Sequence, residues 1–256
     1  MKFVDVAKNA AREAGDLVLE FKGKEKGIHF KAKRDIATIA DKKSEELLHK
    51  ILIEDNFNDH DFLSEESPFN EHGSNFRWIV DPIDGTGNFA HDNPLFCVSI
   101  GLLDGKVPIA GAIYVPTMDE MFSAQIGKGA FLNGKRIFAS KQKKFYDLAL
   151  AVEMPPKENV IRQTLLLEKK LALHHRVRTL GSAAMDLAYV ACGRFDAFIS
   201  AYLYTWDVAG GTAILNEAKG KTSSHDGKTI DLTQKYFNFV ASNGPLHSKL
   251  LEKLKG

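Results

Sequence analysis

Apolar residues recur at helical spacing in two segments near the start of the chain. The first stripe runs from Phe3 to Phe21, with lysine, arginine and glutamate between its apolar positions, and Gly23 follows it. The second stripe runs from about Ile36 to Ile53. Both patterns predict amphipathic helices. Two helices before any long strand argue against a chain that begins with a nucleotide-binding β-α-β unit.

Strands dominate the middle of the chain. Apolar runs rich in β-branched residues occupy residues 96–103, 107–115 and 120–124. Turn residues separate these runs, so the pattern predicts an antiparallel meander. Asn133-Gly134 predicts one more tight hairpin. After about residue 157, helical segments alternate with strands.

This order of elements predicts an α+β fold in which helices cover both sides of mixed sheets. The chain shows no internal repeat, no low-complexity tract and no long linker, so one domain is expected over residues 1–256. If that domain has two lobes, they span about 1–145 and 146–256.

Composition and charge narrow the class of protein. Lys and Arg number 34 and Asp and Glu number 33 in 256 residues, which leaves a formal net charge of +1. This balance gives no general electrostatic reason to expect a nucleic acid or an anionic membrane as partner. Cys97 and Cys192 lie far apart among apolar or small residues, which indicates buried thiols instead of a disulfide or metal clip. No signal region opens the chain and no apolar run approaches roughly 20 residues, so a cytoplasmic protein is expected.

The strongest chemical signal lies at residues 78–89, where an apolar strand runs into two carboxylates three residues apart. Pro82 restrains Asp81 to extended backbone and lacks an N–H, which predicts that the strand ends there. Gly85 permits a turn, and residues 86–88 could open a short helix whose free N–H groups face an anion. Carboxylates beside an anion site require cations between them, so the pattern indicates phosphate bound over metal ions.

Other acidic residues fit the same site. Glu65 and Glu66 follow an apolar strand, and Asp35 and Asp41 lie at or near the start of the second predicted helix. Asp207 opens a later helix, and the small residues after it permit close approach of something bulky or charged. Each signal alone is better explained by a turn, a solvated loop or a helix cap. Because all the candidate ligands are oxygen donors, Mg²⁺ or Mn²⁺ is favoured over zinc.

Taken together, these motifs resemble the inositol monophosphatase family of lithium-sensitive, magnesium-dependent phosphatases. One family signature matches Asp81-Pro-Ile-Asp84-Gly-Thr86, and a second matches Trp206-Asp207-Val-Ala-Gly210. Glu65-Glu66, Asp35 through Asp41 and Gly181-Ser-Ala183 also match in type, order and approximate spacing. The resemblance covers the whole chain. It implies an alternating α-β-α-β-α layered fold, shared with the fructose bisphosphatases.

The resemblance implies which residues hold metal. One Mg²⁺ would be held by Glu65, Asp81 and the carbonyl oxygen of Ile83, and a second by Asp81, Asp84 and Asp207. A third, weaker ion would rest on Glu65 and water, and Mn²⁺ could replace Mg²⁺. Metal ions then activate the attacking water and neutralise the phosphoryl oxygens, so the protein needs no nucleophile of its own.

The resemblance also implies how water and substrate are held. Thr86, paired with Asp41, would orient and help deprotonate the attacking water. The expected catalytic residues are therefore Thr86, Asp41 and Glu65. The expected substrate contacts are Gly85, Thr86, Asp84, Gly181, Ala183 and Ser200, with the backbone of Gly85 and Thr86 on the phosphate and Gly181 and Ala183 beside the alcohol.

Two departures from the family pattern bear on the substrate. Gly87 stands where inositol phosphatases commonly have threonine, and Ser200 stands where inositol-preferring members carry a glutamate. The substrate is expected to be a small phosphorylated metabolite of the inositol-1-phosphate or sugar-phosphate kind. Histidinol phosphate, a fructose bisphosphate and a nucleotide phosphate stay open, as does a regulatory interaction protein that keeps the fold. A homodimer is expected.

Overall fold

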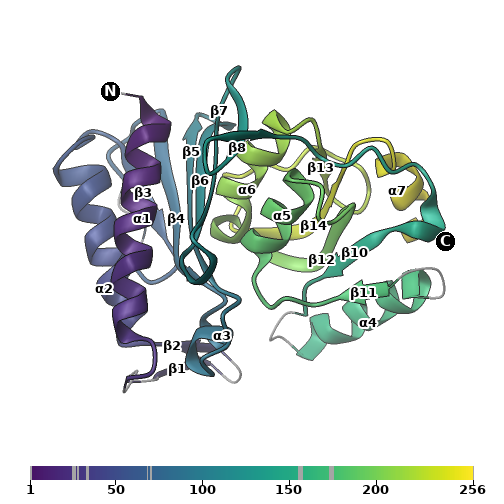
Figure 1. Ribbon diagram of the computed structural model, residues 1–256, viewed down its shortest axis with the longest axis horizontal. Coiled ribbons are helices and arrows are strands. Elements are labelled where there is room, and N and C mark those ends of the chain that lie inside the picture. The colour runs from purple at the N-terminus through teal and green to yellow at the C-terminus, as the bar shows by residue number, and fades with distance from the viewer. Residues whose placement is uncertain are drawn as a thin grey trace.

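Two sheets alternate with three layers of helices in the computed structural model (Figure 1). The structure describes residues 2–24, 27, 29–32, 35–67, 69, 71–154, 158–172 and 176–255. Its α-helices are α1 (Phe3–Phe21), α2 (Ile39–His49), α3 (Thr86–Ala90), α4 (Glu158–Ala172), α5 (Ala183–Ala191), α6 (Thr205–Glu217) and α7 (His247–Lys255). A π-helix over Lys50–Glu54 continues α2, and single 3₁₀ turns cover Pro116–Met118 and Phe145–Asp147.

A seven-stranded sheet holds the first half of the chain, in the order β3-β4-β5-β6-β7-β8-β9. Its strands are β3 (Asp61–Ser64), β4 (Phe76–Asp84), β5 (Cys97–Asp104), β6 (Val107–Val115), β7 (Glu120–Gln125), β8 (Gly129–Leu132) and β9 (Lys135–Ile137). Only β3 and β4 pair in parallel within it, and the meander over β5, β6 and β7 is confirmed. The hairpin at Asn133-Gly134 is confirmed too, since both residues have the positive φ that such two-residue turns require.

A five-stranded mixed sheet follows, in the order β11-β10-β12-β14-β13. Its strands are β10 (Ala149–Val152), β11 (Arg176–Arg178), β12 (Ala197–Tyr204), β13 (Lys221–Ser223) and β14 (Tyr236–Ser242). Strand β10 runs parallel to β11 and β12, whereas β14 runs antiparallel to β12 and β13. A short antiparallel pair, β1 (His29–Ala32) and β2 (Asp35–Ala37), lies apart from both sheets.

The alternation of side chains across the large sheet explains the layers. Trp78 and Val80 of β4 pack with α1 and α2 in one apolar core, whereas Ile79 between them packs with α5 and α6 in another. A third core joins the far face of the small sheet to α4 and α7. The predicted α-β-α-β-α sandwich is therefore confirmed, and Figure 1 shows α5 and α6 as its middle layer.

The small residues that follow Asp207 pack against the large sheet. A Cβ added to Gly101 of β5 would lie 2.7 Å from Ala209, and one added to Gly111 of β6 would lie 2.4 Å from the Gly210 carbonyl oxygen. Helix α6 thus contacts the strands through glycine and alanine alone at these points. The expectation that these residues make room for a bulky or charged group was wrong, because the sheet backbone fills that space.

Two predicted boundaries were also wrong. The second helix starts at Ile39 and not at Ile36, because Thr38 caps it and accepts a hydrogen bond from the Asp41 N–H while Asp41 accepts one from the Thr38 N–H. Strand β4 does not stop at Asp81 but runs on to Asp84. Its register with β5 shifts between Asp81 and Asp84, and this irregularity accommodates Pro82.

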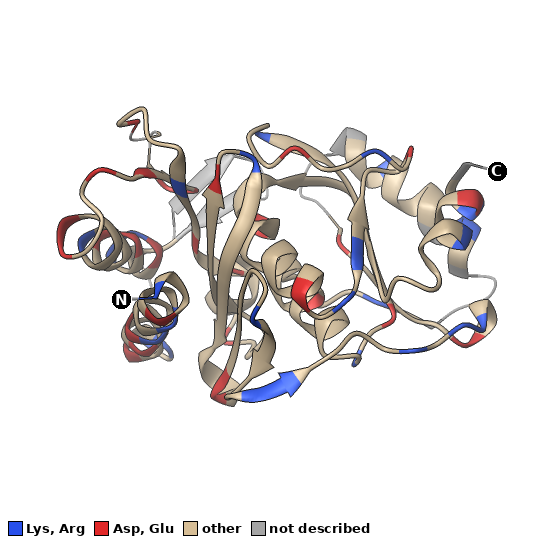
Figure 2. Cartoon of the chain, turned by 90° about the horizontal axis from the view of Figure 1, so that it is seen from above, with Lys and Arg blue, Asp and Glu red and all other residues tan. Residues whose placement is uncertain are grey.

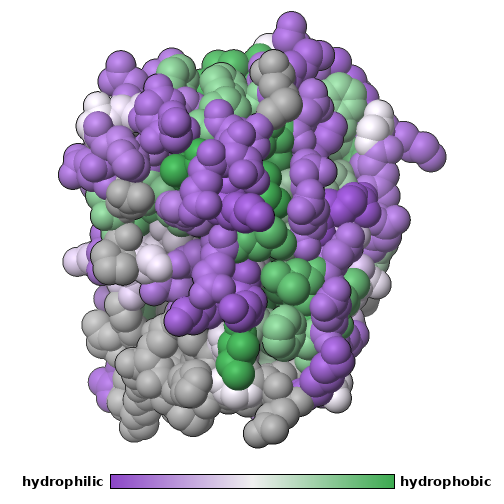
Figure 3. Space-filling model, turned by 90° about the vertical axis from the view of Figure 1, so that its left-hand side faces the viewer, coloured by the Kyte–Doolittle hydropathy of each residue, from purple (hydrophilic) through white to green (hydrophobic). Residues whose placement is uncertain are grey.

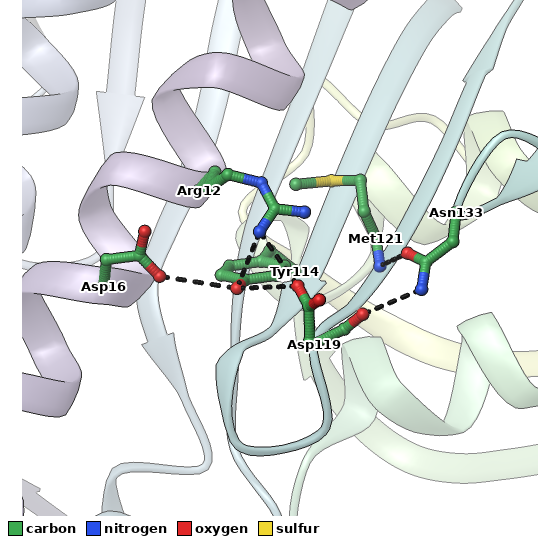
Figure 4. A network of polar contacts seen from close by, with 6 residues as sticks. All are labelled: Arg12, Asp16, Tyr114, Asp119, Met121 and Asn133. Atoms are coloured by element: carbon green, nitrogen blue, oxygen red, sulfur yellow. Dashed lines mark hydrogen bonds and ion pairs between the residues drawn. The ribbon is translucent and has the colours of Figure 1, made fainter.

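A polar network ties α1 to the turn between β6 and β7 (Figure 4). Arg12 donates to the Tyr114 hydroxyl at 3.0 Å and to Asp119 at 2.9 Å, with its guanidinium carbon 4.6 Å from the centroid of the Tyr114 ring. Burial and the nearby Asp16 carboxylate raise the pKa of Tyr114 to about 12, so its hydroxyl stays protonated. Gly15 makes room for this ring, since a Cβ there would lie 2.5 Å from it.

Acidic and basic residues are interspersed along the outer helices α1 and α2 (Figure 2), and hydrophilic side chains cover much of the face that these helices present (Figure 3). None of the helices that the structure describes combines the length and apolar character of a membrane span. We propose that residues 1–256 form one domain, with the boundary between its lobes near the break between the two sheets.

Candidate functional site

One polar face of α2 contacts the ends of β3 and β4, where predicted site residues lie. Ser44 donates to the Pro82 carbonyl oxygen at 3.0 Å, next to Asp81. Glu45 accepts hydrogen bonds from the hydroxyls of Ser64 and Ser67. It also accepts one from the Glu66 N–H, directly after Glu65, at 3.1 Å. These contacts fix the ends of β3 and β4 side by side, so that Glu65 and Asp81 emerge at the same edge of the sheet.

Asp41 lies on that face as well and reaches the turn after β4. Its Oδ1 atom accepts a hydrogen bond from the Thr86 hydroxyl at 3.1 Å, while its Oδ2 atom caps α2. The Thr86 Oγ1 atom also lies 2.9 Å from the carbonyl oxygen of Ile83. A hydroxyl has one proton, so Thr86 donates to Asp41 or to Ile83 at a given moment.

Backbone approaches at Gly85 shape the turn that precedes α3. Gly85 has φ 93°, and a Cβ there would lie 2.9 Å from the Leu95 carbonyl oxygen and 3.1 Å from that of Gly181. The Asn88 amide donates to the carbonyl oxygens of Leu95 at 2.6 Å and Leu180 at 2.7 Å. The residues before α5 are thereby held against the turn at Gly85, although they are almost a hundred positions away in sequence.

The Asp84 carboxylate, at the end of β4, lies against the first residues of α5. Its Oδ2 atom accepts hydrogen bonds from the Ser182 hydroxyl at 2.6 Å and from the Ala184 N–H at 2.7 Å, and the Ala183 N–H also donates to this carboxylate. Free N–H groups at the beginning of a helix favour a negative group. Gly181 and Ala183, predicted to line the substrate pocket, are therefore next to Asp84.

Asp207 lies in the first turn of α6 and accepts a hydrogen bond from the Tyr204 N–H at 2.7 Å. Asp81 accepts one from the Ile83 N–H at 3.1 Å. Burial raises the pKa values of Asp81 and Asp207 well above the ordinary aspartate value, and nearby carboxylates raise them further. Glu65 and Asp84 act on both of these pKa values, so the four carboxylates among the predicted metal ligands share one region of negative potential.

The donor set fits a hard cation. Asp81 and Asp84 are buried, and burial raises the pKa of Asp84 as well. Among the described residues, the charges with the largest effect on the pKa values of Asp81 and Asp207 belong to other carboxylates. Buried carboxylates of this kind require protons or cations to balance them. No three acidic, histidine or cysteine side chains among the described residues already converge as the ligands of an ion do. Asp84 and Asp207 instead direct an oxygen to a backbone N–H.

Ser200 differs from its predicted place. Its side chain is fully buried, and its hydroxyl lies 3.0 Å from the Tyr202 carbonyl oxygen and 3.2 Å from the Tyr202 N–H. The pairing of β12 with β14 shifts in register directly after Ser200, so this hydroxyl closes a local irregularity in the strand. The geometry gives no support to a contact between Ser200 and a substrate.

Two groups of site residues were missed from the sequence. Ser44 and Glu45 share the buried stripe of α2 with Asp41 at spacings of three and four residues, and polar residues on such a stripe are a signal that could have found them. Asp186 of α5 is fully buried, and neither of its carboxylate oxygens has a hydrogen-bond partner among the residues that the structure describes. Burial and the charge of Glu153 raise the pKa of Asp186 well above the ordinary value. The side chain of Asp35 is not among those described.

The stability of the metal-free protein should fall as the pH rises through the range in which Glu153 ionises. Burial raises the pKa of Glu153 from an ordinary 4.5 to about 8. Between these values the folded chain keeps a proton that the unfolded chain releases, so stability declines from about pH 4.5 to about pH 8. Glu153→Gln should therefore stabilise the protein at pH 8 and change little at pH 5.

Urea unfolding in chelator at the two pH values measures this difference. The exposed Glu252→Gln variant is the matched control and should behave alike at both. An equal gain for Glu153→Gln at pH 5 and pH 8 would contradict the assignment.

Comparison with known proteins identifies a family and several relatives that this chain resembles. The model of the inositol monophosphatase family matches residues 1–256. Inositol monophosphatase 1 of Solanum lycopersicum is 36% identical over 262 residues, covering 99% of this chain and 95% of that protein. A protein of Aquifex aeolicus named fructose-1,6-bisphosphatase/inositol-1-monophosphatase is 33% identical over 258 residues, covering 99% and 96%. The crystal structure of extragenic suppressor protein suhB from Bartonella henselae superposes with a TM-score of 0.92 at 34% identity, covering 98% of this chain and 97% of that one.

Proposed function

Because the chain belongs to the inositol monophosphatase family, we propose that it hydrolyses a small phosphate monoester with water activated by Mg²⁺. Membership makes it a phosphoric monoester hydrolase that depends on metal, and the identity and number of the ions, the substrate and the assembly are the parts that we propose. One observation carries the proposal. Buried carboxylates that raise one another's pKa values lie beside the glycine turn at Gly85.

The residues that would hold metal follow from the site. Glu65, Asp81 and the Ile83 carbonyl oxygen would bind one Mg²⁺, and Asp81, Asp84 and Asp207 a second. A third ion would rest on Glu65, and Mn²⁺ is a substitute. Bound there, the ions would neutralise the phosphoryl oxygens and lower the pKa of the attacking water.

The chain's own groups would position the reactants. A metal ion held by the Ile83 carbonyl oxygen would compete with the Thr86 proton for that oxygen, which would favour donation from the Thr86 hydroxyl to Asp41 and leave a hydroxyl lone pair for the attacking water. The backbone of Gly85 and Thr86 would bind the phosphate. Gly181 and Ala183, held next to Asp84, would contact the alcohol.

For the substrate we propose inositol-1-phosphate or a related sugar or polyol phosphate. The plant relative is named for inositol monophosphate, and the Aquifex relative also for fructose-1,6-bisphosphate. Histidinol phosphate and a nucleotide 3′-phosphate are the further candidates. The Ser200 hydroxyl is buried and bonded to the backbone of Tyr202, so it would not supply the polyol contact that a glutamate would make at this position. A cytoplasmic homodimer completes the proposal.

A phosphate-release screen over a panel of monoesters tests this function. Each monoester is assayed with Mg²⁺, with Mn²⁺ and with chelator. Release that needs the metal and is highest for a sugar or polyol phosphate is the expected result. Release that continues in chelator would refute the metal mechanism, and release from none of the panel would refute the activity.

Lithium should slow turnover without displacing the first metal. The expectation rests on family membership, with Li⁺ competing at the position framed by Asp81, Asp84 and Asp207. Steady-state rates over a lithium series at fixed Mg²⁺ measure the effect, with the same series in NaCl as the control for ionic strength. Rates that follow NaCl and LiCl alike would show that this position differs from that of its relatives.

A regulatory interaction protein is the second candidate function. It is supported by the likeness to proteins named for suppressor and Nus-factor roles, among them a Nus factor SuhB of Xylella fastidiosa that is 34% identical over 221 residues. A pull-down from cell extract with the Asp84→Asn variant separates the two candidates. A partner captured equally by the wild-type chain and the variant would establish an interaction that does not need catalysis.

A further inference from the structure

A cavity adjoins the predicted metal site. It has a volume of about 400 Å³ and begins at Glu65, where β3 ends, and at Trp206, which precedes Asp207. Arg77 and Lys235 lie in its wall. None of Gly181, Ala183 and Ser200, the residues expected beside the alcohol, lines it. The cavity is therefore a separate space that shares only the metal side of the site.

Arg77 faces the same side of the large sheet as Asp81. The two residues are four positions apart on β4, and alternate side chains of a strand point to the same face. At roughly 3.3 Å per residue, about 13 Å of strand separates them. A guanidinium on this face is thus within the span of a small ligand whose phosphate lies at the metal site.

The Arg77 side chain is held in place yet keeps bonding capacity. Its Nη2 atom lies 3.4 Å from the buried carboxylate of Asp61, and its guanidinium carbon lies 4.4 Å from the centroid of the Phe69 ring. The Nε atom is buried and has no hydrogen-bond partner within the described part of the chain. Asp61 also accepts backbone N–H bonds from His72 and Ser74, so its charge is shared among several donors. A buried donor without a partner favours an acceptor from a ligand.

Lys235 supplies a second positive charge in the same wall. It is exposed, and no ion pair to it occurs within the described part of the chain. Glu65 is the only acidic residue among those that line the cavity, and a metal ion bound at Glu65 would neutralise it. With metal present, the cavity then carries a net positive charge.

We propose that this cavity is a second anion subsite, in which Arg77 and Lys235 bind a phosphate-class group beside the metal site. The group comes either from the same substrate, as its second phosphate, or from a free inorganic anion. The first source rests on the proposed function, whereas the second does not. Guanidinium groups suit such ligands because their planar N–H donors match the oxygens of a phosphate.

Two variants and one control test the proposal. Arg77→Gln and Lys235→Gln each remove one positive charge from the cavity, and the exposed Lys128→Gln, which does not line it, removes one elsewhere. Each protein is assayed in Mg²⁺ with glycerol 2-phosphate, whose alcohol is uncharged, and with a hexose bisphosphate. Sulfate binding to the Mg²⁺-loaded proteins is measured by calorimetry, which needs no catalysis.

A selective effect on one probe identifies the source of the anion. If the substrate supplies it, Arg77→Gln lowers kcat/KM for the bisphosphate about tenfold or more and leaves glycerol 2-phosphate within about twofold, as loss of a charge-assisted hydrogen bond predicts. If a free anion supplies it, sulfate binding weakens in both variants and not in Lys128→Gln. An unchanged substrate ratio together with unchanged sulfate binding overturns the proposal.

A variant that fails to fold and a failure of the proposed function can each be told apart from a failure of the subsite. Should Arg77→Gln fail to fold, Lys235→Gln decides alone, because its exposed side chain has no structural partner among the described residues. Should the wild-type protein hydrolyse neither these probes nor any member of the monoester panel, the proposed function fails, while the sulfate titration still supports or overturns the subsite.

Discussion

Replacing Asp84 by asparagine should remove nearly all turnover and leave the protein folded. The side chain keeps its shape, and its oxygen still accepts the N–H of Ala184 at the start of α5. The lost negative charge removes a ligand from the second predicted Mg²⁺. Because such ions contribute several kcal/mol to transition-state stabilisation, kcat should fall roughly 10³-fold.

The stability of this variant provides the complementary measurement. Burial and nearby acids oppose ionisation here, so Asp84→Asn should be at least as stable as the wild-type protein without metal at pH 7. Thermal unfolding in chelator measures this, and kcat at saturating Mg²⁺ measures the loss. The exposed Asp226→Asn is the control for an acidic residue outside the site. Full activity in Asp84→Asn would refute its role as a ligand.

Replacing Thr86 by alanine should lower kcat roughly 10²-fold while changing KM little, as expected for the loss of a group that positions a proton in the transition state. The hydroxyl lies 3.1 Å from Asp41 and 2.9 Å from the Ile83 carbonyl oxygen, at the ends of two different elements. Neither contact holds a substrate alcohol.

Thr86→Ser is the matched control, because it keeps the hydroxyl and removes only a methyl group. It should retain most of the activity. Steady-state kinetics of the three proteins at saturating Mg²⁺ separate the effects on kcat and KM. A variant altered only in KM would show that Thr86 is a passive contact to the phosphate.

The sequence alone predicted helices on both sides of mixed sheets and the carboxylates that we propose to hold metal. Helices α1 and α4 and the meander are local patterns, because burial of one face imposes a period on the sequence that tertiary contacts do not change. The residues at 81–86 are informative for a similar reason. Proline, glycine and two carboxylates within six positions restrict the backbone and supply the ligands in one segment.

The tertiary structure alone decided what holds those residues. Glu45 fixes the segment that bears Glu65, and Asn88 holds α3 against the residues before α5. Both side chains contact segments that are distant in sequence, and such contacts leave no periodic pattern in the local sequence. The strand irregularities at Pro82 and after Ser200 are likewise set by the neighbouring strand. At position 200, the change of register accompanies a buried serine hydroxyl that is bonded to the backbone of Tyr202, and the local sequence carries no sign of that bond.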